Sequence, residues 1–297
     1  MKRLSLEETI REAERKNRTI SSLVKENEAL SMGVTVEEVT ASMGNLYDVM
    51  LQVYKKGTAE EKRSVSGLTG GEGFRLMRYA GEKQSEGIYL RAAARAMGIA
   101  NVNASMGRIV AAPTAGSCGI LPGTLITLAE QYGKGKEEVV DCLFTAAYIG
   151  KVIADNASLS GAEGGCQAEC GSAAAMAAGA GVEMRGGTPG QTAHAVAFAL
   201  KAVMGLICDP VAGLVESPCV KRNGFGAVQA LLAVDMALAG IESVIPADEV
   251  ITAMGEVGRA MPESLRETAE GGIAATPTGR KIADYLMNSG SYCPKSQ

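Results

Sequence analysis

Apolar residues in the first part of the chain recur every three or four positions, which is the spacing of an amphipathic α-helix. After Thr35 the apolar positions are Val39, Met43, Tyr47, Met50, Leu51 and Tyr54. Ser5-Leu-Glu-Glu8 and Thr35-Val-Glu-Glu38 both match the capping box, in which a hydroxyl and a glutamate satisfy free amides at a helix start. Lys55-Lys56-Gly57 combines cations with a glycine, so we predict that the helix after Thr35 ends there.

Glycines and prolines divide the rest of the chain into further helices. Ser64-Val-Ser-Gly-Leu-Thr-Gly-Gly-Glu-Gly73 has too many glycines for regular structure and predicts a loop, followed by a helix over residues 87–105. Beyond Ala112 the predicted helices cover residues 123–132, 137–158, 167–182, 189–206, 227–240 and 246–261. Thr188-Pro189 offers a favoured N-cap followed by proline at the first helical position.

The pattern predicts an all-α fold. No pair of β-branched runs alternates as the strands of a sheet would, and no repeat, charged linker or low-complexity tract interrupts the chain. We expect residues 1–297 to form a single helical domain, with residues 1–60 as an N-terminal helical subdomain. Aromatic residues make up only 4% of the chain and tryptophan is absent, so alanine, glycine, valine, leucine and the 14 methionines must fill the core. Such a core suits helices that approach closely.

Composition and charge narrow the class of protein. A hydrophobic fraction of 46% and a charged fraction of 21% are ordinary for a soluble globular protein, and a net charge of −4 gives no reason to expect nucleic-acid binding. The longest apolar stretch, near residues 195–215, is interrupted by Lys201 and by Cys208-Asp-Pro210, which makes it a poor membrane span. The N-terminus has no apolar signal core, and the cysteines number seven. Both points favour a reducing cytoplasm with free or metal-bound thiols.

Three cysteines occur beside small or backbone-breaking residues. Cys166 follows Glu163-Gly-Gly, Cys208 precedes Asp209-Pro210, and Cys219 follows Ser217-Pro218. Because proline fixes φ and removes a backbone donor, the last two contexts predict turns rather than helix interiors. Thiols on stiff turns suit a soft metal centre with three thiolates and an open fourth position, and an open position is typical of a catalytic site.

The other cysteines are less distinctive. Cys170 lies one helical turn after Cys166, so it is either a rival ligand or a packed neighbour. Cys118 lies inside a glycine-rich turn and could approach a site, whereas Cys142 lies on an apolar helix face and belongs to the core. Cys293 stands four residues from the end of the chain.

A glycine-rich turn, Pro113-Thr-Ala-Gly-Ser-Cys-Gly-Ile-Leu-Pro122, precedes an apolar helix. Outward-pointing amides and a helix N-terminus make such a turn able to hold a carboxylate or a phosphate, although a plain helix–helix turn is the alternative. The turn matches neither a P-loop nor a dinucleotide fingerprint. His194 is the only histidine and lies in an apolar setting, where histidines are more often structural than catalytic. A Ser-His-Asp triad or a zinc site of several histidines is therefore unexpected.

Taken together, residues 113–122, 164–174 and 208–223 identify a family resemblance. The chain resembles, over nearly its full length, the α chain of the bacterial iron–sulfur-dependent L-serine dehydratases. The resemblance implies a mostly helical catalytic domain that converts L-serine to pyruvate and ammonia. It implies that Cys166, Cys208 and Cys219 hold a [4Fe–4S] cluster, and so selects Cys166 over Cys170. The iron that lacks a cysteine would act as a Lewis acid on the departing hydroxyl.

The resemblance also bears on the substrate site and on partners. Together with the anion-binding character of the turn, it places the substrate carboxylate near Thr114, Ala115, Gly116 and Ser117. Some members of the family are single chains in which a β domain, with Ser- and His-containing motifs, precedes the α domain. This chain starts directly with the α part, so we expect it to be one subunit that works with a separate β chain.

Several questions stay open at this point. The general base is His194, a residue of the β chain or another side chain. Some relatives carry a cysteine near the C-terminus that reaches the open iron, so Cys293 either caps the cluster or is a thiol without a role. The same open cluster could also act on L-cysteine as a desulfidase, and a non-catalytic metal-binding subunit is the remaining alternative.

Overall fold

Helices provide the regular secondary structure of this protein. The computed structural model describes residues 4–82 and 87–290, and within them the backbone forms two isolated bridges but no β-strand. The α-helices are α1 (Leu6–Lys16), α2 (Ile20–Met32), α3 (Val36–Ala59), α4 (Glu72–Glu82), α5 (Ile88–Ala104), α6 (Ile120–Tyr132), α7 (Lys136–Asn156), α8 (Gly161–Gly164), α9 (Ser172–Met184), α10 (Pro189–Ala202), α11 (Cys219–Leu238), α12 (Ala247–Ala260) and α13 (Pro277–Ser289). The predicted all-α fold is confirmed over this part of the chain.

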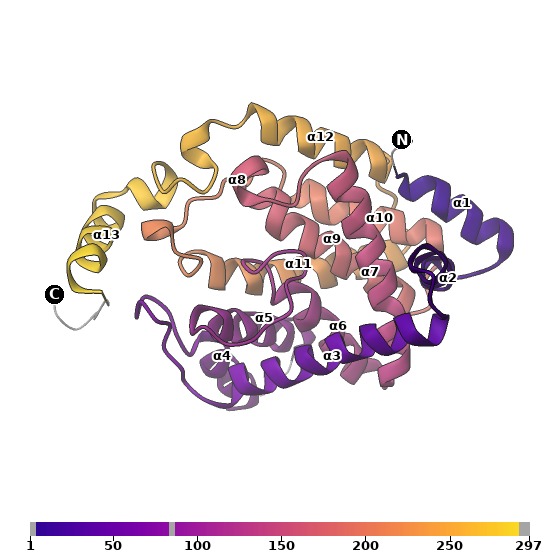
Figure 1. Ribbon diagram of the computed structural model, residues 1–297, viewed down its shortest axis with the longest axis horizontal. Coiled ribbons are helices and arrows are strands. Elements are labelled where there is room, and N and C mark those ends of the chain that lie inside the picture. The colour runs from indigo at the N-terminus through magenta and orange to yellow at the C-terminus, as the bar shows by residue number, and fades with distance from the viewer. Residues whose placement is uncertain (1–3, 83–86, 291–297) are drawn as a thin grey trace.

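Helix α9 lies at the centre, with α6, α7, α10 and α11 packed against it (Figure 1). The side chains from Ser172 to Val182 are uncharged and mostly small, and every residue of the helix except Glu183 is buried. A helix that is apolar on all sides must be enclosed by others. The small residues also set the spacing, because a Cβ added at Gly179 would lie 2.3 Å from Ile149 of α7.

The start signals read from the sequence are present in the structure. Ser5 accepts a hydrogen bond from the amide of Glu8 at 3.2 Å, and Thr35 and Glu38 form both halves of a capping box. Helix α10 begins at Pro189, as predicted. Helices α5, α6, α7 and α12 lie within a few residues of their predicted ranges, and α9 is entered through a π-helical turn at Gln167–Gly171.

The predicted end of α3 at Gly57 is wrong. The helix continues to Ala59, and Gly57 is buried inside it. A Cβ at Gly57 would lie 2.1 Å from the carbonyl oxygen of Gly98 in α5. The glycine therefore serves a close crossing of two helices and not a helix end, which the cations beside it could not reveal.

Other boundaries also differ from the prediction. Helix α11 begins at Cys219, eight residues before the predicted start at 227, and α10 ends at Ala202, before the predicted 206. Gly224 and Gly226 made the first part of α11 look like a turn in the sequence. In the structure they lie inside the helix, where it contacts Met97 and Ile120. Helices α4 and α13 were not predicted.

The N-terminal helices share the main hydrophobic core. Leu6 of α1 and Ile20 of α2 are fully buried in the same cluster as Ala174 and Val196. A subdomain division near residue 60 remains a prediction.

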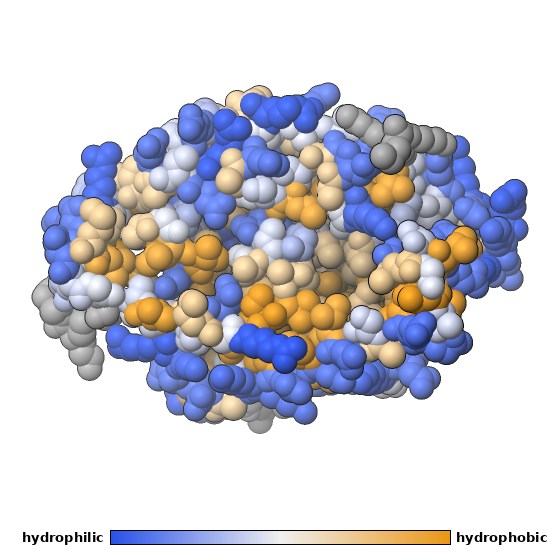
Figure 2. Space-filling model, viewed as in Figure 1, coloured by the Kyte–Doolittle hydropathy of each residue, from blue (hydrophilic) through white to orange (hydrophobic). Residues whose placement is uncertain are grey.

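Helix α13 lies at the opposite end of the molecule from α1 and α2 (Figure 1). Figure 2 shows hydrophilic side chains along the upper and lower edges of this face and apolar ones gathered in the hollowed band between them. None of the helices described is long and apolar enough to cross a membrane.

Candidate metal centre

Two cysteines far apart in the sequence meet inside the protein. The sulfurs of Cys166 and Cys208 lie 3.8 Å apart, and both side chains are buried. The carboxylate of Glu169 joins them, so that one ligand atom from each of the three lies within 4.8 Å of the other two. Thiolates and a carboxylate in this arrangement could hold a metal ion.

The backbone around Cys166 is shaped by glycine and glutamine. Gly165 adopts φ of +75°, and a Cβ there would lie 2.8 Å from the carbonyl oxygen of Leu206. The Gln167 amide donates to that oxygen at 3.0 Å, while the Gln167 side chain accepts from the amide of Gly205 at 2.8 Å. These contacts fix the π-helical turn that starts after Cys166. Such turns inside helices are frequent at functional sites.

Cys208 is fixed by a bridge to a segment much later in the chain. Its amide donates to the carbonyl of Leu265 at 2.9 Å, and its carbonyl accepts from the amide of Glu267 at 2.7 Å. The structure therefore confirms that Cys208 lies outside a helix. The two hydrogen bonds form a parallel bridge of the kind found between neighbouring strands.

Cys219 lies nearby but outside the tightest group. It is the first residue of α11, directly after Pro218, so the predicted turn is here a helix start. Burial, together with the negative charges of Cys166 and Glu169, raises the pKa of the Cys219 thiol to about 12.

Arg222, one turn into α11, connects the cysteine segments. Its guanidinium donates to the sulfur of Cys166 at 3.3 Å, to the carbonyl of Ile207 at 3.0 Å and to the carboxylate of Asp209 at 2.9 Å. Hydrogen bonds from the thiols of Cys170 and Cys208 lower the pKa of Cys166, and Arg222 lowers it further. The hydrogen bond to Cys166, together with burial, raises the pKa of the Cys208 thiol, so Cys166 is the thiol of this group that ionises most readily.

The glycine-rich turn faces this group. Thr114 donates a hydrogen bond from its hydroxyl to Glu169 and lies 3.0 Å from the hydroxyl of Ser117. A Cβ at Gly116 would lie 2.5 Å from Oε1 of Glu169, so only glycine fits there without displacing the carboxylate. The backbone of the turn and the carboxylate therefore line one site.

Asn223 ties the turn to the cysteines. Its buried amide group donates to the carbonyls of Gly116, at 2.7 Å, and Cys219, at 2.9 Å, and accepts from the amide of Gly119 at 2.9 Å. One side chain thus fixes the position of the glycine turn relative to the start of α11.

Glu169 is the functional candidate that the sequence analysis missed. Its side chain is buried, and burial raises its pKa to about 7, against the opposing effect of the hydrogen bond from Thr114. One signal was available, because Glu169 is the only charged residue between Glu163 and Glu183. Burying a carboxylate costs free energy unless it is paired or hydrogen-bonded, so a single carboxylate in an apolar helical stretch indicates a specific role.

The remaining sequence candidates lie in different places. Cys170 is buried beside Cys166, whereas Cys118 packs among Val53, Ile99 and Val102 and so belongs to a hydrophobic cluster. Cys142 is buried in the main core, as predicted.

His194 lies away from the cysteines. Its Nδ1 accepts a hydrogen bond from the amide of Ser243 at 3.2 Å. It lines a cavity of about 250 Å³ with α1 and the segment before α12, and none of the residues around the cysteines lines that cavity. Cys293 lies outside the described residues.

Comparison with known proteins places the chain among enzymes of one kind. Residues 15–274 match the protein family described as serine dehydratase alpha chain. The chain is 52% identical over 255 residues to the probable L-serine dehydratase, alpha chain, of Bacillus subtilis, with 85% of each protein covered. It is 45% identical over 273 residues to the L-serine dehydratase, alpha chain, of Peptoniphilus asaccharolyticus, with 91% of this chain and 94% of the relative covered. The L-serine dehydratase of Streptomyces coelicolor is 38% identical over 277 residues, which span 60% of that longer protein.

Proposed function

The chain belongs to the serine dehydratase alpha chain family, and from this membership we propose that it is the α subunit of an iron–sulfur-dependent L-serine dehydratase. The enzyme would be a lyase that converts L-serine to pyruvate and ammonia. The observation that carries the proposal is the buried group of Cys166, Cys208 and Glu169, set against the glycine turn at Thr114.

The cysteines present fit a [4Fe–4S] cluster. Cys166, Cys208 and Cys219 are free, buried thiols from three separate segments, and sulfur is the donor that iron–sulfur clusters require. Arg222 supplies positive charge beside Cys166, which favours the thiolate needed for ligation. We assign these three cysteines as the ligands. Lewis acidity toward the hydroxyl that leaves is the chemistry that such a group supplies when bound.

The glycine turn would bind the substrate carboxylate. We place that carboxylate against Thr114, Ala115, Gly116 and Ser117, where small residues expose the backbone and α6 begins directly afterwards. Asn223 holds this turn at a fixed distance from Cys219, and so would fix the distance between the carboxylate and the metal centre. Orientation of this kind lowers the barrier by removing unproductive poses.

We place the general base at Glu169 rather than at His194. The Glu169 carboxylate lies beside both Gly116 and the cysteines, whereas His194 lines a separate cavity. Oε1 or Oε2 of Glu169 would take the α-proton and pass it to the departing β-hydroxyl, which then leaves as water. The product, 2-aminoacrylate, then takes up water and gives pyruvate and ammonia.

A separate β chain is part of this proposal. The two relatives of which 85% and 94% is covered are named alpha chains, whereas the longer Streptomyces protein has about two fifths of its length outside the match. We expect the complex to lie in the cytoplasm and to bind neither nucleic acid nor a membrane, as the free thiols and modest negative charge favour.

The proposal is tested by anaerobic purification of the chain with its partner, followed by iron and sulfide analysis and a pyruvate assay. We expect about four irons and four sulfides per chain, and pyruvate from L-serine faster than from L-cysteine. Sulfide release from L-cysteine at the higher rate would reassign the substrate. A pure complex that forms pyruvate without iron would overturn the assignment of the cluster.

A further inference from the structure

A second polar cavity lies behind the turn that carries Cys166. It has a volume of about 390 Å³ and is walled by residues around α8, by α12 and by Arg266. The polar side chains that line it are Ser158, Glu163, Arg259 and Arg266. Thr114, Glu169 and the cysteines do not line it, so this cavity is separate from the proposed substrate site.

Both arginines of this cavity lack a carboxylate partner among the described residues. Arg266 makes one long hydrogen bond of 3.4 Å, to the carbonyl of Glu163, and its buried Nε has no partner. The guanidinium of Arg259 lies over the backbone at Gly255, where a Cβ would be 3.4 Å from Nη1. Neither residue takes part in a salt bridge within the described part of the chain.

The charges in the cavity do not balance. Glu163 is its only lining carboxylate, and this group accepts a hydrogen bond from the hydroxyl of Ser158 at 2.5 Å. Among the side chains that line the cavity, two guanidinium groups stand against one carboxylate, an excess of one positive charge. Guanidinium groups bind planar or tetrahedral oxyanions through paired N–H donors.

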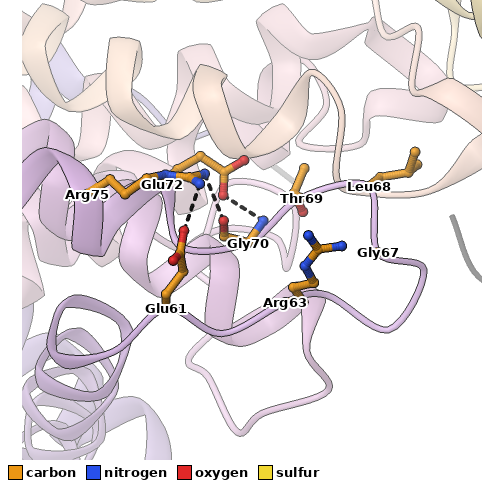
Figure 3. A pocket seen from close by; sticks show the side chains of 8 residues that line it. All are labelled: Glu61, Arg63, Gly67, Leu68, Thr69, Gly70, Glu72 and Arg75. Atoms are coloured by element: carbon orange, nitrogen blue, oxygen red, sulfur yellow. Dashed lines mark hydrogen bonds and ion pairs between the residues drawn. The ribbon is translucent and has the colours of Figure 1, made fainter. Parts of the chain in front are cut away.

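A different pocket, shown in Figure 3, provides a contrast. There two arginines, Arg63 and Arg75, and two glutamates, Glu61 and Glu72, line the wall in equal number. Arg75 donates to Glu61 at 2.7 Å and to the carbonyl of Gly70 at 2.9 Å, so both of its terminal nitrogens already have a partner. The lining of that pocket therefore carries no excess positive charge.

We propose that the cavity between Arg259 and Arg266, which we call the two-arginine pocket, binds a small oxyanion, a carboxylate or a phosphate. The single excess positive charge suits an anion of low charge. The buried Nε of Arg266 would gain the partner that it lacks, which is the state that buried donors normally reach.

The pocket is physically connected to both cysteine segments. Gly164, in its wall, lies two residues before Cys166. Leu265 and Glu267, on either side of Arg266, form the bridge to Cys208. An anion held by Arg266 and by the residues around Glu163 would therefore tie these two segments together. Binding itself does not depend on serine dehydration, so a failure of the proposed function leaves this inference untouched.

The test is a calorimetric titration of the full chain, without L-serine, with inorganic phosphate in one series and acetate in another. We expect saturable binding of at least one of these anions at one site per chain. Arg259→Gln should weaken it tenfold or more, Arg259→Lys should weaken it less, and Arg266→Gln should weaken it independently. Arg280→Gln, an exposed arginine on α13, is the matched control and should bind like the wild type.

The two titration series distinguish a phosphate site from a carboxylate site. Binding of phosphate alone would identify a phosphate site, and binding of acetate alone a carboxylate site. Absence of saturable binding of both anions, or equal affinity in the wild type and in folded Arg259→Gln and Arg266→Gln, would overturn the proposal. Circular dichroism of each variant establishes that the fold is retained.

Discussion

At the scale of single residues, the neighbours that the fold supplies distinguish cysteines that are otherwise alike. Cys142 and Cys166 are both buried thiols, yet one belongs to the main core and the other meets Cys208, Glu169 and Arg222. Burial alone therefore does not mark a ligand. What distinguishes Cys166 is the charge and sulfur gathered around it from other segments.

We predict that Cys166→Ala, Cys208→Ala and Cys219→Ala each lose the iron of the reconstituted protein, because each removes one of three thiolates. Iron per chain, measured together with the visible absorbance, should fall to background. Cys142→Ala is the control, and it should keep its iron while losing about 1 kcal/mol of stability to a small cavity. Full iron in any of the first three variants would remove that cysteine from the ligand set.

A second residue-scale prediction concerns Glu169. Glu169→Gln keeps the shape and the hydrogen bond from Thr114 but cannot take a proton, so kcat with L-serine should fall about 100-fold or more. Iron content should stay at the wild-type level. Glu256→Gln, an exposed glutamate of α12, should have normal kcat. A Glu169→Gln enzyme with normal kcat and normal iron would return the search for the base to the β chain.

At the scale of helices, small residues decide how closely the elements pack. The crossing of α3 and α5 places Gly57 against Gly98, backbone to backbone. The same α3 contains Gly44, where a Cβ would meet only the end of Lys136, at 3.7 Å. Both glycines occur inside one amphipathic helix, and only the neighbouring helix shows that Gly57, but not Gly44, lies at a close crossing.

This pair gives a matched test of the packing. Gly57→Ala should destabilise the protein by about 1–3 kcal/mol, since the new methyl has no room beside the Gly98 carbonyl. Gly44→Ala should stabilise it by about 0.5–1 kcal/mol through the better helix propensity of alanine. Thermal unfolding of both variants measures the difference. Equal melting temperatures for the two would mean that α3 and α5 can move apart without cost.

Glu183 joins three helices and provides a prediction about pH. It lies at the end of α9 and accepts hydrogen bonds from the amide of Ser21 at 3.3 Å and from the hydroxyl of Thr145 at 2.8 Å. Burial raises its pKa above the ordinary value, and these donors only partly oppose that effect. Between the ordinary and the raised pKa the folded protein binds more protons than the unfolded chain, so this group makes stability fall as pH rises.

Glu183→Gln should remove this part of the pH dependence. We expect the melting temperature of the wild type to decline more steeply than that of the variant as the pH rises from the ordinary carboxyl pKa toward neutrality. Melting curves at a series of pH values, at constant ionic strength, measure the two slopes. Parallel curves for the two proteins would mean that Glu183 has the same pKa folded and unfolded.

At the scale of the whole molecule, local patterns predicted the elements better than their contacts. The all-α fold, most helix starts and the core position of Cys142 follow from periodicity, caps and composition. The end of α3 and the start of α11 do not follow from these patterns. Gly57 and Gly224 are needed for close contact with the neighbouring helix α5, and not for the ends of their own helices. The local sequence of a helix does not show which residues of another helix will pack against it.

The candidate site shows the same limit. The cysteine contexts and the glycine turn were visible as motifs, but the meeting of Glu169 with Thr114 joins residues 55 positions apart. Asn223 stands 107 positions from Gly116, which it holds. Such contacts are a property of the folded chain alone. The sequence could therefore name the turn and the thiols, but not the carboxylate between them.

The bridge between Cys208 and the segment around Arg266 has a consequence for how the protein is made. During synthesis the cysteines leave the ribosome in the order 166, 208, 219, well before Leu265 and Glu267, which fix Cys208, have been made. A nascent chain stalled after α11 would hold every assigned ligand and still lack the partner that orients one of them. We therefore expect the proposed cluster to be inserted only after Leu265 and Glu267 have been made and Cys208 has reached its final orientation.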